Sequence, residues 1–120
     1  MPKSKYFTVE CADDLLIISL VGSIGALEEA VIRDDWDEVL ALSETAEIRH
    51  AIIDLGKLEY FGSIVLELLV GLWKRISNKQ GKLAICNASP LGREVLHVAR
   101  FDTIWLVASG LQDAKDAVRE

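Results

Sequence analysis

The segment Ser63–Lys79 repeats its apolar residues at the spacing of an α-helix, shortly after a strand-like apolar run. Residues three or four apart share a helix face, so this spacing predicts a helix with one buried side. The preceding run, His50–Leu55, predicts a buried strand, and Gly81 is expected to end the helix. A buried strand followed by an amphipathic helix is the building unit of α/β folds. The apolar positions of the helix are Val65, Leu68, Leu69, Leu72 and Ile76.

The rest of the chain alternates in the same way. Ser89-Pro90 is a helix-start signal, with serine as N-cap and proline at the first helical position. The order ββαβαβαβα predicts an α/β fold with a mostly parallel central sheet opened by an antiparallel hairpin, about five strands and four helices in all. Strands are expected at Tyr6–Cys11, Leu15–Val21, His50–Leu55, Leu83–Cys86 and Ile104–Val107. Helices are expected at Ala26–Ala46, with a break at Asp34-Asp35, and at Ser63–Lys79, Ser89–Ala99 and Ser109–Val118.

Length and composition restrict the classes of function. The 120 residues are 51% hydrophobic and 27% charged, as expected for a single globular domain over residues 1–120. The net charge is −6 without a basic cluster, so we expect no nucleic-acid binding. The longest nearly uncharged apolar run, Leu15–Leu27, is too short to cross a bilayer, so no direct membrane insertion is expected. These features predict a cytoplasmic protein.

The groups that could carry chemistry are few and scattered. His50 and His97 have no cysteine nearby, and Cys11 and Cys86 lack metal-ligand spacing, so no metal, cofactor or catalytic site is predicted. Both cysteines are expected to be buried free thiols. No phosphate-binding glycine motif is present, which argues against an enzyme or nucleotide binder.

The loop before the long helix is the strongest candidate site. Ser63 is expected either to cap the helix, by accepting a hydrogen bond from a backbone N–H near Leu66, or to belong to a partner-docking loop. Tyr60, Phe61 and Ile64 either fold inward over the sheet or form an exposed apolar docking patch. The predicted partner-binding residues are Tyr60, Phe61, Gly62, Ser63 and Ile64.

Three segments in order resemble the STAS domain family of bacterial anti-sigma factor antagonists. Ala46–Leu55 resembles the strand before the family's switch loop, and Leu58–Lys74 keeps the hydrophobic spacing of the helix that follows. Asn87–Ile104 follows the family's N-x-S-P helix and next strand without a gap. The resemblance implies a STAS fold over nearly the whole chain and a non-enzymatic protein-interaction module.

The switch loop departs from the family pattern. The family reads D-S-S-G and phosphorylates the second serine, whereas this chain has Gly62, Ser63, Ile64 and Val65. The resemblance therefore places an isoleucine at the phosphoacceptor position and leaves Ser63 as the candidate phosphoacceptor. Arg100 stands where the family has a helix-ending glycine, so either arginine takes the left-handed conformation or the helix end is remodelled.

The resemblance implies a partner-switching function. An unphosphorylated antagonist of this family binds a serine-kinase anti-sigma factor and frees the sigma factor, and phosphorylation reverses the binding. With this loop, the chain is expected to use Ser63 or to bind its partner constitutively. We also expect Ile64→Asp to weaken partner capture and leave the fold intact. The alternatives are a non-phosphorylated STAS scaffold, a sensor-complex or transporter-accessory subunit and, less favoured, a small nucleotide-binding α/β protein.

Overall fold

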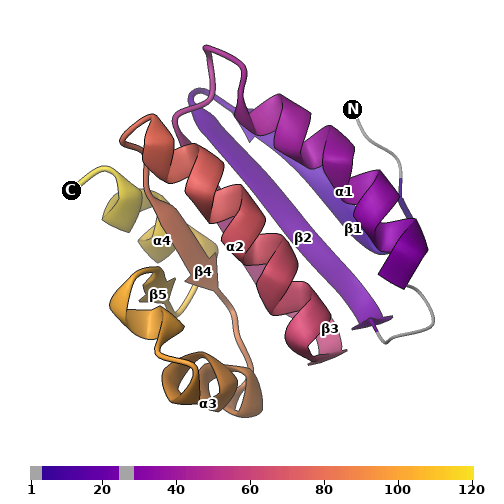
Figure 1. The fold of residues 1–120 in the computed structure, drawn as a ribbon. Helices are drawn as coiled ribbons and strands as arrows, with labels where there is room; N and C mark the ends of the chain where they lie inside the picture. The colour runs from indigo at the N-terminus through magenta and orange to yellow at the C-terminus, as the bar shows by residue number, and fades with distance from the viewer. Residues whose placement is uncertain (1–3, 25–28) are drawn as a thin grey trace.

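The computed structural model describes residues 4–24 and 29–120, and its ribbon is drawn in Figure 1. The order of elements is the predicted one, with a short 3₁₀ helix added before the last strand. The strands are β1 (Phe7–Ala12), β2 (Leu15–Ile24), β3 (His50–Phe61), β4 (Leu83–Cys86) and β5 (Leu106–Ala108). The helices are α1 (Glu29–Ser43), α2 (Ser63–Asn78), α3 (Pro90–Val98), the 3₁₀ helix η2 (Phe101–Thr103) and α4 (Leu111–Val118).

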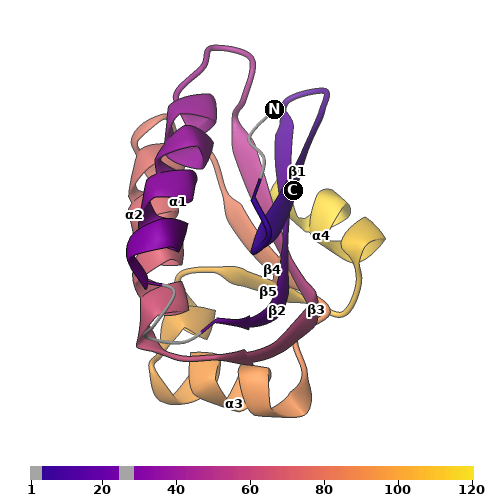
Figure 2. The same cartoon turned by 90° about the vertical axis from the view of Figure 1, so that its right-hand side faces the viewer.

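The five strands form one mixed sheet in the order β1-β2-β3-β4-β5. β1 and β2 pair antiparallel, and every later pair is parallel, which confirms the predicted α/β architecture. The hairpin turn contains Asp13 with a φ of 55°, a conformation that aspartate tolerates better than most residues. Figure 2 shows α1 and α2 on one face of the sheet and α4 on the other.

The core lies on both faces of the sheet and is larger under α1 and α2. There the Trp36 indole nitrogen donates a hydrogen bond to the Leu68 carbonyl at 3.1 Å, which joins the two helices. The Trp36 ring also meets Phe7 of β1 edge to face, with centroids 5.4 Å apart. On the opposite face, α4 covers a smaller cluster with its buried residues Ala114 and Val118. Helices α1, α2 and α4 thus cover the two faces of the sheet, and α3 lies elsewhere.

Several predicted boundaries are wrong for identifiable reasons. Asp34-Asp35 does not divide α1, because the apolar face continues unbroken through Ile32, Trp36 and Val39. β3 runs on to Phe61 where a loop was expected, because its second half pairs with the end of β2. The last strand begins at Leu106 and not at Ile104, because η2 precedes it. The predicted start of α1 at Ala26 lies outside the described residues.

Two backbone positions explain how helices end. Arg100 has a φ of 64°, so the arginine does take the left-handed conformation that the family's glycine would serve. Gly81 is the predicted end of α2, but the left-handed residue after the C-cap Lys79 is Gln80, with a φ of 65°. Gly81 comes next, and its lack of a side chain serves a contact with neighbouring backbone. A Cβ atom built on Gly81 would lie 1.7 Å from the Arg49 carbonyl oxygen, so no other residue fits there without movement of the backbone.

Candidate functional site

The site begins where β3 passes into α2. Gly62 precedes the helix in an extended conformation, with φ −121° and ψ −154°, and Ser63 is the first helical residue. The prediction that Ser63 caps the helix is therefore wrong, because the extended backbone of β3 continues to Gly62 and moves the cap there. Within the described residues, no side chain caps this helix N-terminus. Ser63 is exposed, so its hydroxyl is accessible at the positive end of α2.

Ile64 points into the protein. Only 8% of its surface is exposed, and it packs in the main core with Val65 and Leu68 of the same helix. Of the two alternatives for the apolar residues of the loop, Ile64 therefore takes the inward one. One helical step turns the side-chain direction by about 100°, which places Ser63 in solvent and Ile64 in the core. The burial of Ile64 removes the basis for expecting that Ile64→Asp leaves the fold intact, and predicts a loss of stability instead.

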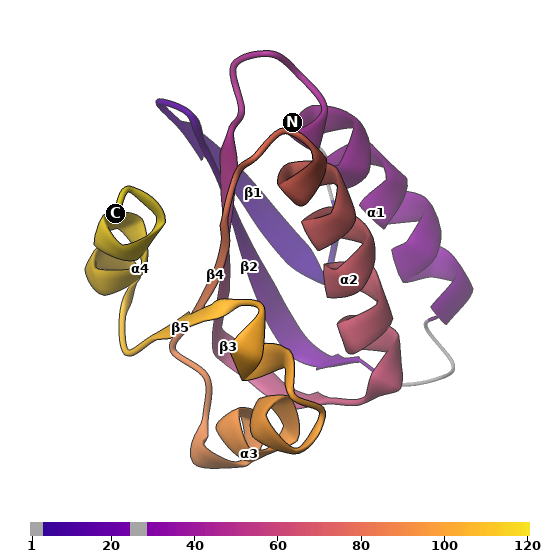
Figure 3. The same cartoon turned by 60° about the vertical axis from the view of Figure 1, so that its left-hand side comes forward.

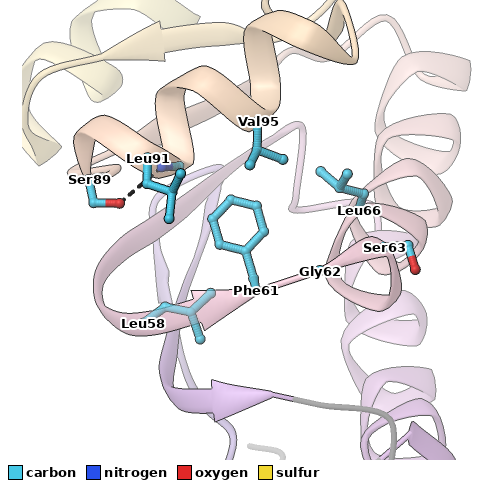
Figure 4. Close-up of a pocket in the computed structure, with 9 residues that line it drawn as sticks. Leu58, Phe61, Gly62, Ser63, Leu66, Ser89, Leu91 and Val95 are labelled. Carbon is cyan, nitrogen blue, oxygen red and sulfur yellow. Dashed lines mark hydrogen bonds between the residues drawn. The ribbon is translucent and has the colours of Figure 1, made fainter.

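Phe61 is half-buried at the end of β3 and faces α3. Figure 4 shows its ring in the middle of a hollow, with Leu91 and Val95 of α3 on one side and Leu66 of α2 on the other. The Ser63 hydroxyl is directed away from the ring. Tyr60 belongs to β3, where its backbone pairs with Ser23. The predicted docking residues thus separate into an exposed serine, a half-buried ring and a core isoleucine.

The hollow is a cavity of about 340 Å³ between the β3–α2 junction and the first turns of α3. Figure 3 shows α3 beyond the carboxyl end of the strands, near the N-terminal end of α2. The lining is almost entirely apolar, and none of its residues carries a charge. The lining residues are Leu58, Phe61, Gly62, Ser63, Leu66, Ser89, Leu91, Gly92 and Val95.

The local sequence explains how α3 is fixed at this cavity. Ser89 is the N-cap, as predicted, and its Oγ accepts a hydrogen bond from the Gly92 N–H at 3.0 Å. Pro90 follows at the first helical position. Leu96 on the inner face is buried, while Leu91 on the cavity side is 65% exposed. Leu91 is continuous with the apolar lining of the cavity, and contiguous exposed apolar surface of this kind tends to mark an interaction site.

The remaining candidate groups have structural explanations. His50 is buried, and its Nδ1 accepts the backbone N–H of Lys82 at 2.9 Å, which ties β3 to the segment before β4. Burial lowers the pKa of His50, so the imidazole is favoured in its neutral form. At the surface, the His97 Nδ1 atom lies 2.9 Å from Oδ2 of Asp102. Over residues 4–24 and 29–120, no group of three or more His, Cys, Asp or Glu side chains is arranged to hold a metal.

The two thiols differ. Cys86 is buried as predicted, and burial raises its pKa to about 11. Cys11 is exposed, so the prediction that both are buried is wrong for this residue. Alternation does not account for this, because Cys11 lies on the same strand face as the buried Phe7 and the half-buried Val9. Burial on that face decreases along the edge strand β1 towards its end, where Cys11 lies.

Sequence reasoning missed the cavity and the contribution of α3. A signal was present, because Leu91, Val95 and Val98 lie on a helix face separate from the buried Gly92 and Leu96. Leu91 and Val98 are 65% and 74% exposed, which marks this second apolar face as unused by the core. The cavity itself depends on how α3 meets β3, which no local pattern specifies.

Comparison with known proteins places this geometry in a family. The STAS domain family model matches residues 6–114. BtrV of Bordetella bronchiseptica is 29% identical over 112 residues, which is 93% of each chain. The anti-sigma-F factor antagonist RsfB of Mycobacterium tuberculosis is 27% identical over 118 residues, covering 98% of this chain and 93% of RsfB.

A solved structure agrees with these matches. An anti-sigma-factor antagonist (STAS) domain protein from Planctomyces limnophilus superposes with a TM-score of 0.76 at 33% identity, over 95% of this chain and 98% of that one. Among the residues that the structure describes, no helix combines the length and apolar character needed to cross a bilayer. The chain belongs to the STAS domain family and groups there with the anti-sigma factor antagonists, which are non-enzymatic regulators.

Proposed function

We propose that this protein is an anti-sigma factor antagonist that binds a serine-kinase anti-sigma factor in a partner-switching pathway. The observation that carries the proposal is the exposed Ser63 at the start of α2, beside an apolar cavity with the exposed Leu91 at its edge. The names of the similar proteins support the class of partner. This function would place the protein in the cytoplasm.

The docking surface in this proposal combines the loop and α3. Phe61 and Leu91 supply apolar area, and the Tyr60–Ile64 segment supplies the backbone of the β3–α2 junction. Ile64 contributes indirectly, because its burial in the core fixes the first turn of α2. The partner would therefore contact Ser63 and its apolar neighbours, while Ile64 holds them in place.

Any phosphate on this loop would be on Ser63. Ile64, at the position where the resemblance places the family's phosphoacceptor, has no hydroxyl and is buried. A phosphate on Ser63 would sit at the helix N-terminus, where the dipole favours negative charge, so the fold would tolerate it. The same phosphate would bring about two negative charges to the edge of an apolar docking surface, where desolvation and repulsion oppose binding. Its formation is expected to be slow, because Ser63 is one residue before the position that the resemblance assigns to the phosphoacceptor, and one residue along a helix changes the side-chain direction.

Affinity capture tests the proposal. Tagged wild-type protein, Ser63→Asp and Ser63→Ala are compared for capture of a serine-kinase anti-sigma factor from the native cell. Capture by wild type and Ser63→Ala, with a loss in Ser63→Asp, is the expected result. Ser77→Asp is the matched control, because Ser77 is an exposed serine in the last turn of the same helix. Equal capture by Ser63→Asp and Ser77→Asp would show that the partner does not dock at this loop.

Intact-mass measurement after incubation with the captured kinase and ATP tests the switch itself. We expect slow addition of one phosphate, abolished by Ser63→Ala. Capture without any phosphorylation would favour the alternative of a non-phosphorylated STAS scaffold or sensor-complex subunit. The observation that favours this alternative is the buried Ile64, which lacks a hydroxyl at the position assigned to the family's phosphoacceptor.

A further inference from the structure

The cavity beside Ser63 is large for a gap between packed elements. A cavity of about 150 Å³ lined by apolar side chains is enough to bind benzene. The volume here is about 340 Å³, in a hollow that is partly open to solvent, and it falls within the roughly 300–1,000 Å³ of known small-molecule sites.

The lining specifies the chemistry of an occupant. Five of the nine lining residues are large apolar side chains and two are glycines. The two remaining residues are serines, and the Ser89 hydroxyl already accepts the Gly92 N–H. None of the lining side chains is charged, and an ion would lose water on entering, which disfavours charged ligands. The positive end of α2 reaches the lining only at Gly62 and Ser63, and the Ser63 hydroxyl is directed away from the Phe61 ring. The lining therefore suits an uncharged molecule that is mostly apolar.

Part of the wall is anchored in the fold without a ligand. Leu58 is buried in the main core, and the half-buried Leu66 packs against that core from α2. Gly92 contacts the Phe61 ring closely, since an added Cβ would lie 3.1 Å from Phe61 Cε1. The N-cap at Ser89 fixes the first turn of α3. A preformed site costs a ligand little reorganisation on binding.

We propose that this cavity is a binding site for a small, uncharged, apolar molecule, and that its occupant hinders docking of the partner at the same surface. The claim that a small molecule binds is argued from the volume and lining of the cavity alone. The regulatory part rests on the proposed function, because an occupant would contact Phe61 and Leu91, the apolar residues assigned to partner docking.

The binding part is tested on the full chain without any partner. The probe is N-phenyl-1-naphthylamine, an uncharged aromatic amine whose fluorescence rises in apolar surroundings. We expect saturable binding at one site per chain. Val95→Trp should weaken it by about tenfold or more, because the indole fills the cavity. Val98→Trp is the matched control, since Val98 lies on the same helix, is 74% exposed and does not line the cavity. Circular dichroism confirms that both variants are folded.

Methyl NMR of the wild-type protein makes the test independent of the variants. The probe should shift the methyl signals of Leu58, Leu66, Leu91 and Val95 and leave those of Val118, behind the sheet, unchanged. Absence of saturable binding, or equal affinity in Val95→Trp and Val98→Trp with shifts elsewhere, would overturn the proposal.

Competition separates this inference from the proposed function. Saturating probe should reduce capture of the anti-sigma factor by wild type and not by Val95→Trp. Probe binding with undiminished capture would overturn the regulatory part alone. Capture that depends on Leu91 in a protein that does not bind the probe would overturn this inference and leave the proposed function standing.

Discussion

A Cβ atom added to Gly92 would lie 3.1 Å from Cε1 of Phe61, which makes these two residues the tight contact between α3 and the end of β3. This distance from the added Cβ is shorter than ordinary van der Waals packing, so a methyl group on residue 92 must displace the Phe61 ring. Phe61 borders a cavity and has space to move. The glycine therefore sets how near α3 can approach the β3–α2 junction.

Gly92→Ala tests this relationship. Alanine gains about 1 kcal/mol of helix propensity over glycine. Close approaches of the added Cβ to Phe61 Cε1 at 3.1 Å and to the capping Ser89 Oγ at 3.3 Å offset part of that gain. In the Phe61→Leu background the ring is absent, so Gly92→Ala should be more stabilising there by about 0.5–1 kcal/mol. Urea denaturation of the four proteins measures the coupling. Equal effects of Gly92→Ala in both backgrounds would show that the ring does not sense the methyl group.

Neighbouring residues at the start of α2 should respond oppositely to charge. Ile64→Asp buries a carboxylate in the core and should cost about 3 kcal/mol or more, whereas Ser63→Asp should change stability by less than about 1 kcal/mol. Ile64→Val, which keeps an apolar side chain, should cost only about 0.5–1.5 kcal/mol. Thermal and urea melts give these values. If Ile64→Asp costs little stability, the first turn of α2 must be rotated so that Ile64 does not face the core.

The inner face of α2 should dominate stability. Leu72 is 0% exposed and Leu68 is 5% exposed, so Ala at either position should cost about 2–5 kcal/mol. Leu91→Ala is the control, because that leucine is mostly exposed and should cost under about 1 kcal/mol. Denaturant melts with equal losses for Leu72→Ala and Leu91→Ala would contradict the assignment of the core.

Local patterns predict some of these features well and others poorly. The bounds of β4 and the first residue of α2 follow from sequence, because an apolar run and a helical period are local properties. The extension of β3 to Phe61 depends on pairing with β2, some 35 residues earlier in the chain, and its register is shifted there. Local propensity does not contain that pairing.

For the candidate site, too, local sequence predicts some features and not others. Sequence located the loop and the helix start, but the Ser63 cap was misplaced by one residue, and that residue decides which side chain faces solvent. The cavity joins Phe61 to Leu91 and Val95, which lie about thirty residues later. Such a space depends on the angle at which two elements meet, and helical periodicity carries no information on that angle.

Lys79 should stabilise the fold more than its place near a helix end suggests. Its Nζ donates to the carbonyl oxygens of Ser43, Thr45 and Ile48, at 2.7, 2.9 and 2.6 Å. Lys79→Met keeps the apolar stem and removes all three hydrogen bonds, which should cost about 1–3 kcal/mol. Lys74→Met, on an exposed lysine of the same helix, should cost less than about 0.5 kcal/mol. If the two variants have the same urea midpoint, the three hydrogen bonds of Lys79 do not contribute measurably to stability.

The two thiols should react at different rates. Cys11 is exposed and should be modified rapidly by a thiol reagent such as dithionitrobenzoate in the native protein. Cys86 is buried, and burial raises its pKa to about 11, so it should react only when the protein unfolds. Cys11→Ser should abolish the fast phase and leave the slow one. A fast phase that survives in Cys11→Ser would show that Cys86 is accessible.

The pKa of Cys86 also predicts how stability changes in alkali. The raised pKa means that the folded state holds the thiol proton more tightly than the unfolded state, whose thiol has the ordinary pKa of 9.0. The contribution to stability is therefore complete below pH 9 and is lost as pH rises from about 9 to about 11. Cys86→Ala removes this dependence. The unfolding free energy of the wild type should therefore fall relative to that of Cys86→Ala across that pH range. Urea melts of both proteins at pH 8 and pH 10.5 measure the shift, and a difference that does not change with pH would show that the Cys86 thiol ionises equally well in the folded and unfolded states.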